Sequence, residues 1–177
     1  LLESRGLGDV YKRQDEYFRL ARGDGDIAAM EMTKWFDTNY HYLVPEIEET
    51  TNPSFSDQLF AQQVLPELDS IKQKFCLIGP VTFLALAKSA DSVDKYSIKD
   101  ELTKAYTDLL KHIENLGYTN IQIEEPILGS DLSNQDKSFF SSFYSKLSEN
   151  LNPATKTHLV TYFCLLYTSD AADDQLG

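Results

Sequence analysis

Residues 97–126, SIKDELTKAYTDLLKHIENLGYTNIQIEEP, place a helical pattern directly before a strand pattern. Apolar residues recur every three or four positions from 98 to 116, which is the spacing of one helix face. Gly117 follows at the position where a left-handed C-cap is common. Ile121 and Ile123 then alternate with polar residues, as on a strand with one buried face. The stretch predicts a helix that ends near Gly117 and a strand over 121–124 that ends at Glu125-Pro126.

The same alternation continues on both sides of this stretch. Residues 75–78, FCLI, are a continuous apolar run that ends at Gly79-Pro80, which predicts a strand buried on both faces. A short apolar helix is expected over 81–88, a helix capped by Ser133 follows later, and 157–163 predict a further strand. This order predicts a parallel α/β sheet with right-handed connections, either an open doubly wound sheet or part of a (β/α)8 barrel. No GxGxxG sequence follows these strands, so dinucleotide binding of that kind has no support.

The rest of the chain is less regular. Residues 32–47 are rich in aromatic side chains and lack glycine, and they predict a short strand and a well-packed loop. A later helix is expected to kink or restart at Pro66. The two ends, 1–14 and 164–177, share no periodicity with their neighbours and resemble translated sequencing-adaptor DNA. We therefore exclude the ends from the fold and expect the folded region to be 15–163.

The charge balance restricts the classes of partner. The chain has 16 basic and 28 acidic residues among 177, and its formal net charge is −12. This acidity disfavours nucleic acid and anionic membranes, although it is compatible with one local basic pocket for an anionic small molecule. The apolar runs are far shorter than the ~20 residues of a membrane span. Two distant cysteines, Cys76 and Cys164, form no CxxC pair or disulfide framework, which predicts a reducing, cytoplasmic compartment.

Functional groups of parallel α/β folds gather at the carboxyl ends of the strands, where this sequence has the acidic pair Glu124-Glu125. Adjacent strand residues point to opposite faces, so these two carboxylates cannot form a facing acid–base pair. A glycosidase-type pair would need a second acid from elsewhere, such as Asp37 or Asp131. The alternative is that these acids only cap loops and orient their neighbours.

Sequence signatures of metal sites and serine nucleophiles are absent. His41, His112 and His158 fall in no HxH or HExxH spacing, and GxSxG is missing, so we expect no metal site made wholly by this chain. We interpret His41, which lies between two tyrosines, as a packed and hydrogen-bonded side chain. Lys34 is the one cation of the stretch MTKWF, next to Trp35. It is either a lysine stretched along a strand edge or a contact for an anion.

Four segments carry a resemblance to a known family. Residues 31–42 read EMTKWFDTNYHY and are soon followed by VPE. The segments IGPVTFLALAK at 78–88, IQIEEPIL at 121–128 and LVTYF at 159–163 come after them in order. Together they resemble the N-terminal domain of the cobalamin-independent methionine synthases, over essentially all of residues 15–163.

The resemblance implies an enzyme of two face-to-face (β/α)8 barrels that uses no cobalamin. Such an enzyme moves the methyl group of 5-methyltetrahydropteroyltri-L-glutamate to L-homocysteine and so makes methionine. By the same resemblance, this chain is a partial barrel of three to four strand–helix units, a fragment that is inactive alone. The zinc that activates homocysteine is then held by ligands of the C-terminal barrel, outside this chain.

The resemblance also assigns a role to one residue. It implies that Lys34 contacts the folate substrate, whose glutamate tail is polyanionic. Glu124 stands where the family mostly has aspartate, and no substrate role is expected for it in this barrel. Two other functions stay open at this point. One is a non-catalytic half-barrel that binds folate or another anion, and the other is a barrel enzyme of the uroporphyrinogen decarboxylase type, which lacks the EMTKWFDTNYHY stretch.

Overall fold

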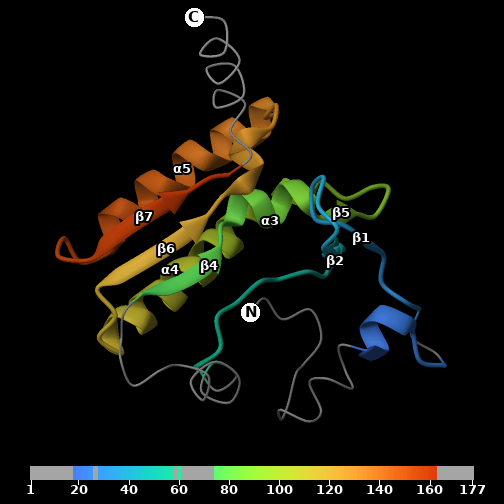
Figure 1. Cartoon of the computed structure of the whole chain (residues 1–177), viewed down its shortest axis with the longest axis horizontal. Coiled ribbons are helices and arrows are strands. Elements are labelled where there is room, and N and C mark those ends of the chain that lie inside the picture. Colours follow the sequence, from blue (N-terminus) through green and yellow to red (C-terminus); the bar gives the residue numbers. More distant parts are fainter. Residues whose placement is uncertain (1–17, 26–27, 58–59, 61–73, 163–177) are drawn as a thin grey trace, which may run out of the picture. The chain divides into compact units, whose positions relative to one another are not determined.

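The computed structural model describes residues 18–25, 28–57, 60 and 74–162 (Figure 1). The chain divides into two compact units. The first unit comprises Leu1–Ile71 and Leu86–Leu109, and the second comprises Lys72–Ala85 and Leu110–Gly177. The excluded ends, 1–14 and 164–177, lie outside the described residues, as does Pro66 with most of the helix expected around it.

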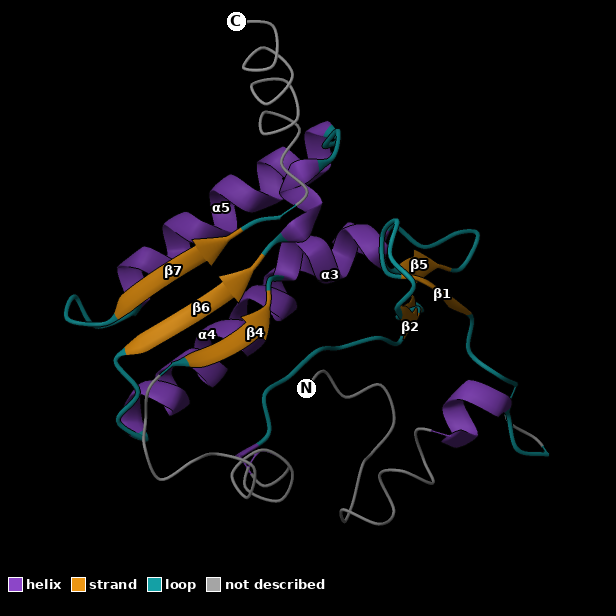
Figure 2. Cartoon of the chain, in the orientation of Figure 1, coloured by secondary structure: helices purple, strands orange, loops and turns teal. Residues whose placement is uncertain are grey.

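The second unit is built on a parallel sheet of three strands, β4 (Phe75–Ile78), β6 (Asn120–Glu124) and β7 (Lys156–Val160). Along the chain, these strands alternate with the helices α3 (Pro80–Leu86), α4 (Lys99–Asn115) and α5 (Asn134–Asn150) (Figure 2). The strand order in the sheet is β4-β6-β7, the same as the order in the chain. The predicted parallel α/β alternation is confirmed, and the described strands form no closed barrel.

The two faces of this sheet differ in burial. Ile121 and Ile123 are fully buried. On the opposite face, Cys76, Gln122 and His158 lie in one row of the register, and Cys76 and His158 are exposed. The expectation that residues 75–78 are buried on both faces is therefore wrong. The reason is that α5 and residues 110–115 of α4 lie on one side of the sheet only (Figure 1).

The buried apolar side chains of this unit come from both helices and strands: Val81, Leu84, Leu110, Ile113, Tyr118, Ile121, Ile123, Phe139, Phe143 and Leu147. Two predicted helix ends are confirmed. Gly117 has a φ of 89°, and its N–H donates to the Glu114 carbonyl at 2.8 Å after the last turn of α4. At the start of α5, Ser133 Oγ accepts from Asp136 N at 3.1 Å while Ser133 N donates to Asp136 Oδ2 at 2.9 Å.

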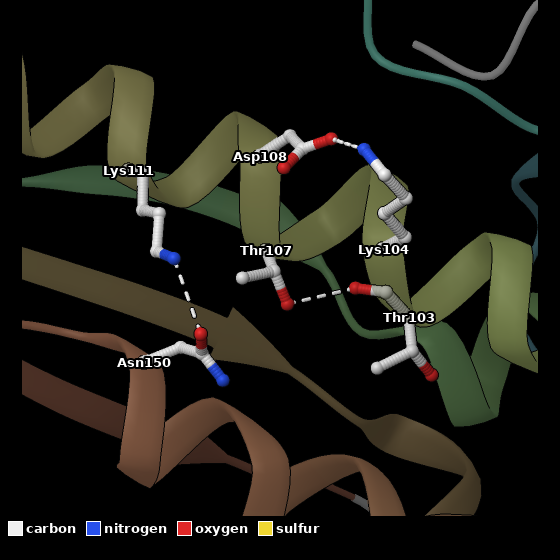
Figure 3. A network of polar contacts seen from close by, with 6 residues as sticks. All are labelled: Thr103, Lys104, Thr107, Asp108, Lys111 and Asn150. Atoms are coloured by element: carbon white, nitrogen blue, oxygen red, sulfur yellow. Dashed lines mark hydrogen bonds and ion pairs between the residues drawn. The ribbon is translucent and has the colours of Figure 1, made fainter.

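Polar contacts join residues of α4 to one another and to the end of α5 (Figure 3). Lys104 and Asp108 form an ion pair one helical turn apart, which contributes about 0.3–0.5 kcal/mol when exposed. Lys111 Nζ donates to Asn150 Oδ1 at 3.1 Å. The second contact links the C-terminal ends of α4 and α5 within the second unit.

The first unit contains two small sheets. β1 (Met32–Lys34) and β2 (His41–Leu43) are antiparallel, whereas β3 (Glu46–Ile47) and β5 (Lys88–Ser89) are parallel. Residues 32–47, for which the sequence predicts a short strand and a well-packed loop, thus contain three short strands. The helix expected over 81–88 ends at Leu86, because the chain then pairs with β3 through Lys88 N and the Pro45 carbonyl at 2.9 Å.

None of the helices in the described part of the chain is long and apolar enough to cross a bilayer.

Candidate functional site

The turn between β1 and β2 is closed by hydrogen bonds at both ends. Trp35 N donates to the Tyr40 carbonyl at 2.7 Å, and Thr38 Oγ1 donates to the Trp35 carbonyl at 2.6 Å. Tyr40 N in turn donates to Thr38 Oγ1 at 3.2 Å. Phe36 has a φ of 50°, a left-handed conformation that costs a residue with a Cβ roughly 1–2 kcal/mol. The surrounding bonds hold this strained conformation in place.

Aromatic rings fix the inner side of the hairpin. The Trp35 ring lies edge-on to Phe36 at 5.1 Å and to Tyr42 at 5.5 Å between centroids. Tyr42 Oη donates to the Leu86 carbonyl at 3.4 Å. Burial raises the pKa of the Tyr42 hydroxyl, nearby Glu31 adds to the rise, and Lys88 opposes it. Glu31 and Lys88 form an ion pair with each other.

Lys34 and His41 lie on the outer side of the same hairpin. They are direct partners in the β1–β2 register, and both are exposed. Neither side chain forms a hydrogen bond or an ion pair with another described residue. The interpretation of His41 as a packed, hydrogen-bonded histidine is wrong, because strand alternation turns Tyr42 inward and His41 outward. The two alternatives for Lys34, a strand-edge lysine or an anion contact, both fit its exposed position.

In the second unit, Glu125 is a fully buried carboxylate at the carboxyl end of β6. Its Oε1 accepts from Val81 N at 3.1 Å and from Tyr144 Oη at 2.9 Å. Its Oε2 accepts from Thr82 N at 2.7 Å and from Thr82 Oγ1 at 2.5 Å. Burial raises the pKa of Glu125, while the hydrogen bonds from Thr82, Tyr144 and Val81 act in the opposite direction.

The side chain of Glu125 packs directly against Gly79, in the space that a side chain at position 79 would fill. A Cβ added to Gly79 would lie 2.1 Å from Glu125 Cδ and 2.5 Å from Glu125 Cγ. Any side chain at this position would therefore displace the carboxylate from the first turn of α3. Glu125 and Gly79 together join the ends of β4 and β6, and Tyr144 adds α5 to the same cluster.

Glu124 has a different environment from Glu125, as the alternation along β6 predicted. Its Oε1 accepts from Gln122 Nε2 at 2.9 Å, and Gln122 Oε1 accepts from Lys74 Nζ at 3.1 Å. Asp131 is exposed, and no hydrogen bond joins it to another described side chain. Asp37 is exposed in the hairpin of the first unit. Glu125 accepts four hydrogen bonds from protein donors, which agrees with the alternative that these acids cap loops and orient their neighbours. A glycosidase-type acid pair has no support among the described residues.

Residues that commonly bind metals are dispersed over the described part of the chain. No group of three or more His, Cys, Asp or Glu residues there could hold a metal ion. Cys76 is a free, exposed thiol on β4, and His158 is exposed on β7. His112 is half-buried on α4, which agrees with its interpretation as a boundary residue.

Sequence reasoning missed Thr82 and Tyr144 as partners of Glu125. A weak signal for Thr82 existed, because a glycine that ends a buried strand often marks a close approach of another group. Thr82 comes three residues after that glycine, in the first turn of a helix whose free N–H groups attract an anion. Nothing in the local sequence distinguished Tyr144 from the other aromatic residues of α5.

The chain is similar to known proteins along most of its length. The model of a family described as "Cobalamin-independent synthase, N-terminal domain" matches residues 5–172. Three curated relatives are each named 5-methyltetrahydropteroyltriglutamate–homocysteine methyltransferase. The protein from Desulforamulus reducens is 37% identical over 89% of this chain, that from Listeria innocua 39% over 83%, and a protein of this name numbered 1 from Arabidopsis thaliana 36% over 84%.

The matched parts of those relatives are short. They amount to 21%, 19% and 20% of the respective proteins. The chain therefore spans about a fifth of the length of the curated relatives that it matches.

Proposed function

The chain belongs to the cobalamin-independent synthase family, in its N-terminal domain, and from this we propose that it is part of an S-methyltransferase that makes methionine. The methyl group would come from 5-methyltetrahydropteroyltri-L-glutamate and pass to L-homocysteine. The relatives' names supply this reaction, and they are 36–39% identical to the chain over most of its length. The family match speaks against the uroporphyrinogen decarboxylase alternative.

We further propose that residues 15–163 form three to four strand–helix units of a (β/α)8 barrel. The supporting observation is the order β4-β6-β7, in which each strand is added beside the preceding one. A doubly wound sheet reverses its strand order at a switch point, whereas a barrel does not. The row formed by Cys76, Gln122 and His158 would then face the barrel interior.

Zinc does not fit the described residues of this chain, because they hold no cluster of metal-binding side chains. In the proposed enzyme, zinc would be bound by residues of the C-terminal barrel, where it would activate the thiol of homocysteine. The part proposed for this chain is to bind the folate substrate in a cytoplasmic enzyme. Its partners would be the two small-molecule substrates and the C-terminal barrel.

The observation that carries the folate proposal is the position of Lys34. It is an exposed cation beside a rigid aromatic turn, in a chain whose net charge is −12. The carboxylates of a glutamate tail are its natural partners, because an ammonium forms charge-assisted hydrogen bonds with them. A monoglutamate offers fewer such carboxylates than a triglutamate.

A chimeric enzyme tests the proposed reaction. Residues 15–163 would replace the matching segment of the Listeria innocua relative, and methionine formation would be measured with the triglutamate folate. We expect activity, and Lys34→Ala should raise the Michaelis constant for this substrate about fivefold with little change in turnover, since an exposed ion contact contributes up to ~1 kcal/mol.

Lys156, an exposed lysine of the second unit, provides the matched control, and Lys156→Ala should leave both constants unchanged. A folded chimera without methyl transfer would contradict the proposed reaction. An unchanged Michaelis constant in the Lys34→Ala chimera would show that Lys34 is only a strand-edge lysine and does not contact the folate.

A further inference from the structure

The hydroxyl of Thr82 links the buried Glu125 carboxylate to the segment that follows β6. Thr82 is fully buried in the first turn of α3, and its Oγ1 donates to Glu125 Oε2 at 2.5 Å. The same Oγ1 accepts from Ile127 N at 3.4 Å. A hydroxyl has one proton to donate and two lone pairs that can accept. Because the proton is directed at the carboxylate, a lone pair remains for the amide of Ile127.

Ile127 belongs to the short 3₁₀ helix η3 (Pro126–Gly129), at the carboxyl end of β6. Within this segment, Leu128 N donates to the Glu125 carbonyl at 3.1 Å. The side chain of Glu125 does not cap η3, because its oxygens bind the start of α3 instead. Functional groups of parallel α/β folds gather at this edge of the sheet. Thr82 therefore connects a segment of that edge to the buried part of the unit.

Tyr144 extends the connection to α5. Its Oη donates to Glu125 Oε1 at 2.9 Å, while Thr82 binds the other oxygen of the same carboxylate. A carboxylate that is held at both oxygens has a fixed orientation, and hydrogen bonds in such a buried network strengthen one another. A change at Tyr144 is therefore transmitted to Ile127 through Glu125 and Thr82.

We propose that Thr82 is a positioning residue: its hydroxyl holds η3 in place on the buried Glu125 carboxylate, and the proposed enzyme requires η3 in this position. The requirement for activity rests on the function proposed above, whereas the link from Thr82 to Ile127 does not. Thr82 is itself buried, so it acts through η3 and not by touching a substrate.

Hydrogen exchange of the full 177-residue chain, followed by NMR, tests the link. Thr82→Val keeps the shape of the side chain but removes the hydroxyl. We expect the amide of Ile127 to exchange about tenfold faster, as for the loss of one hydrogen bond. Thr82→Ser keeps the hydroxyl, and exchange at Ile127 should stay within about twofold of the parent value. Tyr144→Phe should accelerate this exchange about threefold, since it weakens the network at one remove.

Thr155 provides a matched control at the opposite end of the same sheet. Its Oγ1 donates to Glu114 Oε1, so Thr155→Val also removes a hydroxyl from a carboxylate, and exchange at Ile127 should be unchanged. In the other variants, the amide of Lys156, which donates to the Thr119 carbonyl at 2.8 Å, reports a general loosening of the sheet. Circular dichroism would verify that each variant keeps its fold.

The chimeric enzyme measures the effect on activity. Thr82→Val should lower kcat/KM for methyl transfer about fivefold, because a displaced segment at the functional edge misaligns the reacting groups. Thr82→Ser should restore the parent value, and Thr155→Val should keep it. A purely structural role of Thr82 would leave kcat/KM of the folded Thr82→Val chimera unchanged.

Two results would overturn the inference, and they differ from a failure of the proposed reaction. Parent-like exchange at Ile127 in folded Thr82→Val would remove the link; if this variant does not fold, parent-like exchange in Tyr144→Phe would do the same. Faster exchange with an unchanged kcat/KM would confine Thr82 to local structure. A folded parent chimera that transfers no methyl group would contradict the proposed reaction, and faster exchange at Ile127 in Thr82→Val would still support the link.

Discussion

Ionisable side chains of the β1–β2 hairpin and of the carboxyl end of β6 differ in burial and in hydrogen bonding. Glu125 is fully buried, and each of its oxygens accepts two hydrogen bonds from the protein. Lys34 and His41 are exposed and have no side-chain partner among the described residues. A charged side chain that is fully hydrogen-bonded within its own protein stabilises the fold. An exposed charged side chain without such partners, held on a hydrogen-bonded hairpin, can bind a ligand instead.

The largest effect is expected from removing the buried charge. Glu125→Ala would leave the N–H groups of Val81 and Thr82 and the hydroxyl of Tyr144 without their acceptor. Since each buried unsatisfied group costs about 1–3 kcal/mol, we expect a loss of about 3 kcal/mol or more in the free energy of unfolding. Equilibrium urea unfolding followed by circular dichroism measures this loss.

The neighbouring acid is its matched control. Glu124 is partly exposed and accepts one hydrogen bond, from Gln122, so Glu124→Ala should cost less than about 1 kcal/mol. Equal losses in the two variants would show that burial and hydrogen bonding do not distinguish the two acids.

A smaller effect is expected at Gly79. The new methyl group of Gly79→Ala would overlap the side chain of Glu125, and such overpacking costs about 1–3 kcal/mol. Gly25→Ala separates steric overlap from backbone strain, because Gly25 has a φ of 53° and no atom within 4 Å of an added Cβ. We expect thermal unfolding to show the larger loss for Gly79→Ala, and the reverse order would contradict the close packing against Glu125.

The pH dependence of the free energy of unfolding tests the role of the Glu125 carboxylate without removing its side chain. Because burial raises the pKa of Glu125 above its ordinary value of 4.5, the folded state holds this proton more tightly than the unfolded state. Its contribution to stability is therefore present below about pH 4.5 and is lost as the pH rises through the folded-state value. Glu125→Gln should flatten this decline in urea unfolding measured from pH 4 to pH 8. A decline that is unchanged in the variant would assign it to other groups.

The smallest effect on stability is expected at the hairpin. Lys34→Ala removes an exposed side chain without a described partner, so the free energy of unfolding should change by less than about 0.5 kcal/mol. Thermal unfolding at pH 6 and pH 8 measures this change, and a loss comparable to that of Glu125→Ala would erase the contrast between the two regions.

The sequence predicted the elements whose signals are local. Periodicity located α4, the Ser133 cap located the start of α5, and alternation along β6 placed Glu124 and Glu125 on opposite sides. Properties that depend on distant segments were not accessible in this way. The exposure of Cys76 depends on which side of the sheet the helices occupy, and the partners of Glu125 come from residues about 20 and 45 positions away.

For the candidate site, motif and geometry contributed different information. The residues around Lys34 left an anion contact as one of two alternatives, a resemblance indicated folate as the anion, and that role stays a proposal. The exposure of His41 could not be read from its two tyrosine neighbours, because alternation gives the two faces of a strand but does not say which face is buried. The burial of the strand residues supplied that answer, and the register placed His41 across from Lys34.

The matching order of β4, β6 and β7 in the chain and in the sheet has a consequence for synthesis. Each strand pairs with one that has already left the ribosome, so the sheet can grow at one edge while translation continues. No later strand has to insert between two earlier ones. The cost is that the newest strand always presents an open edge, and a nascent chain paused after β7 would offer that edge to a neighbouring nascent chain.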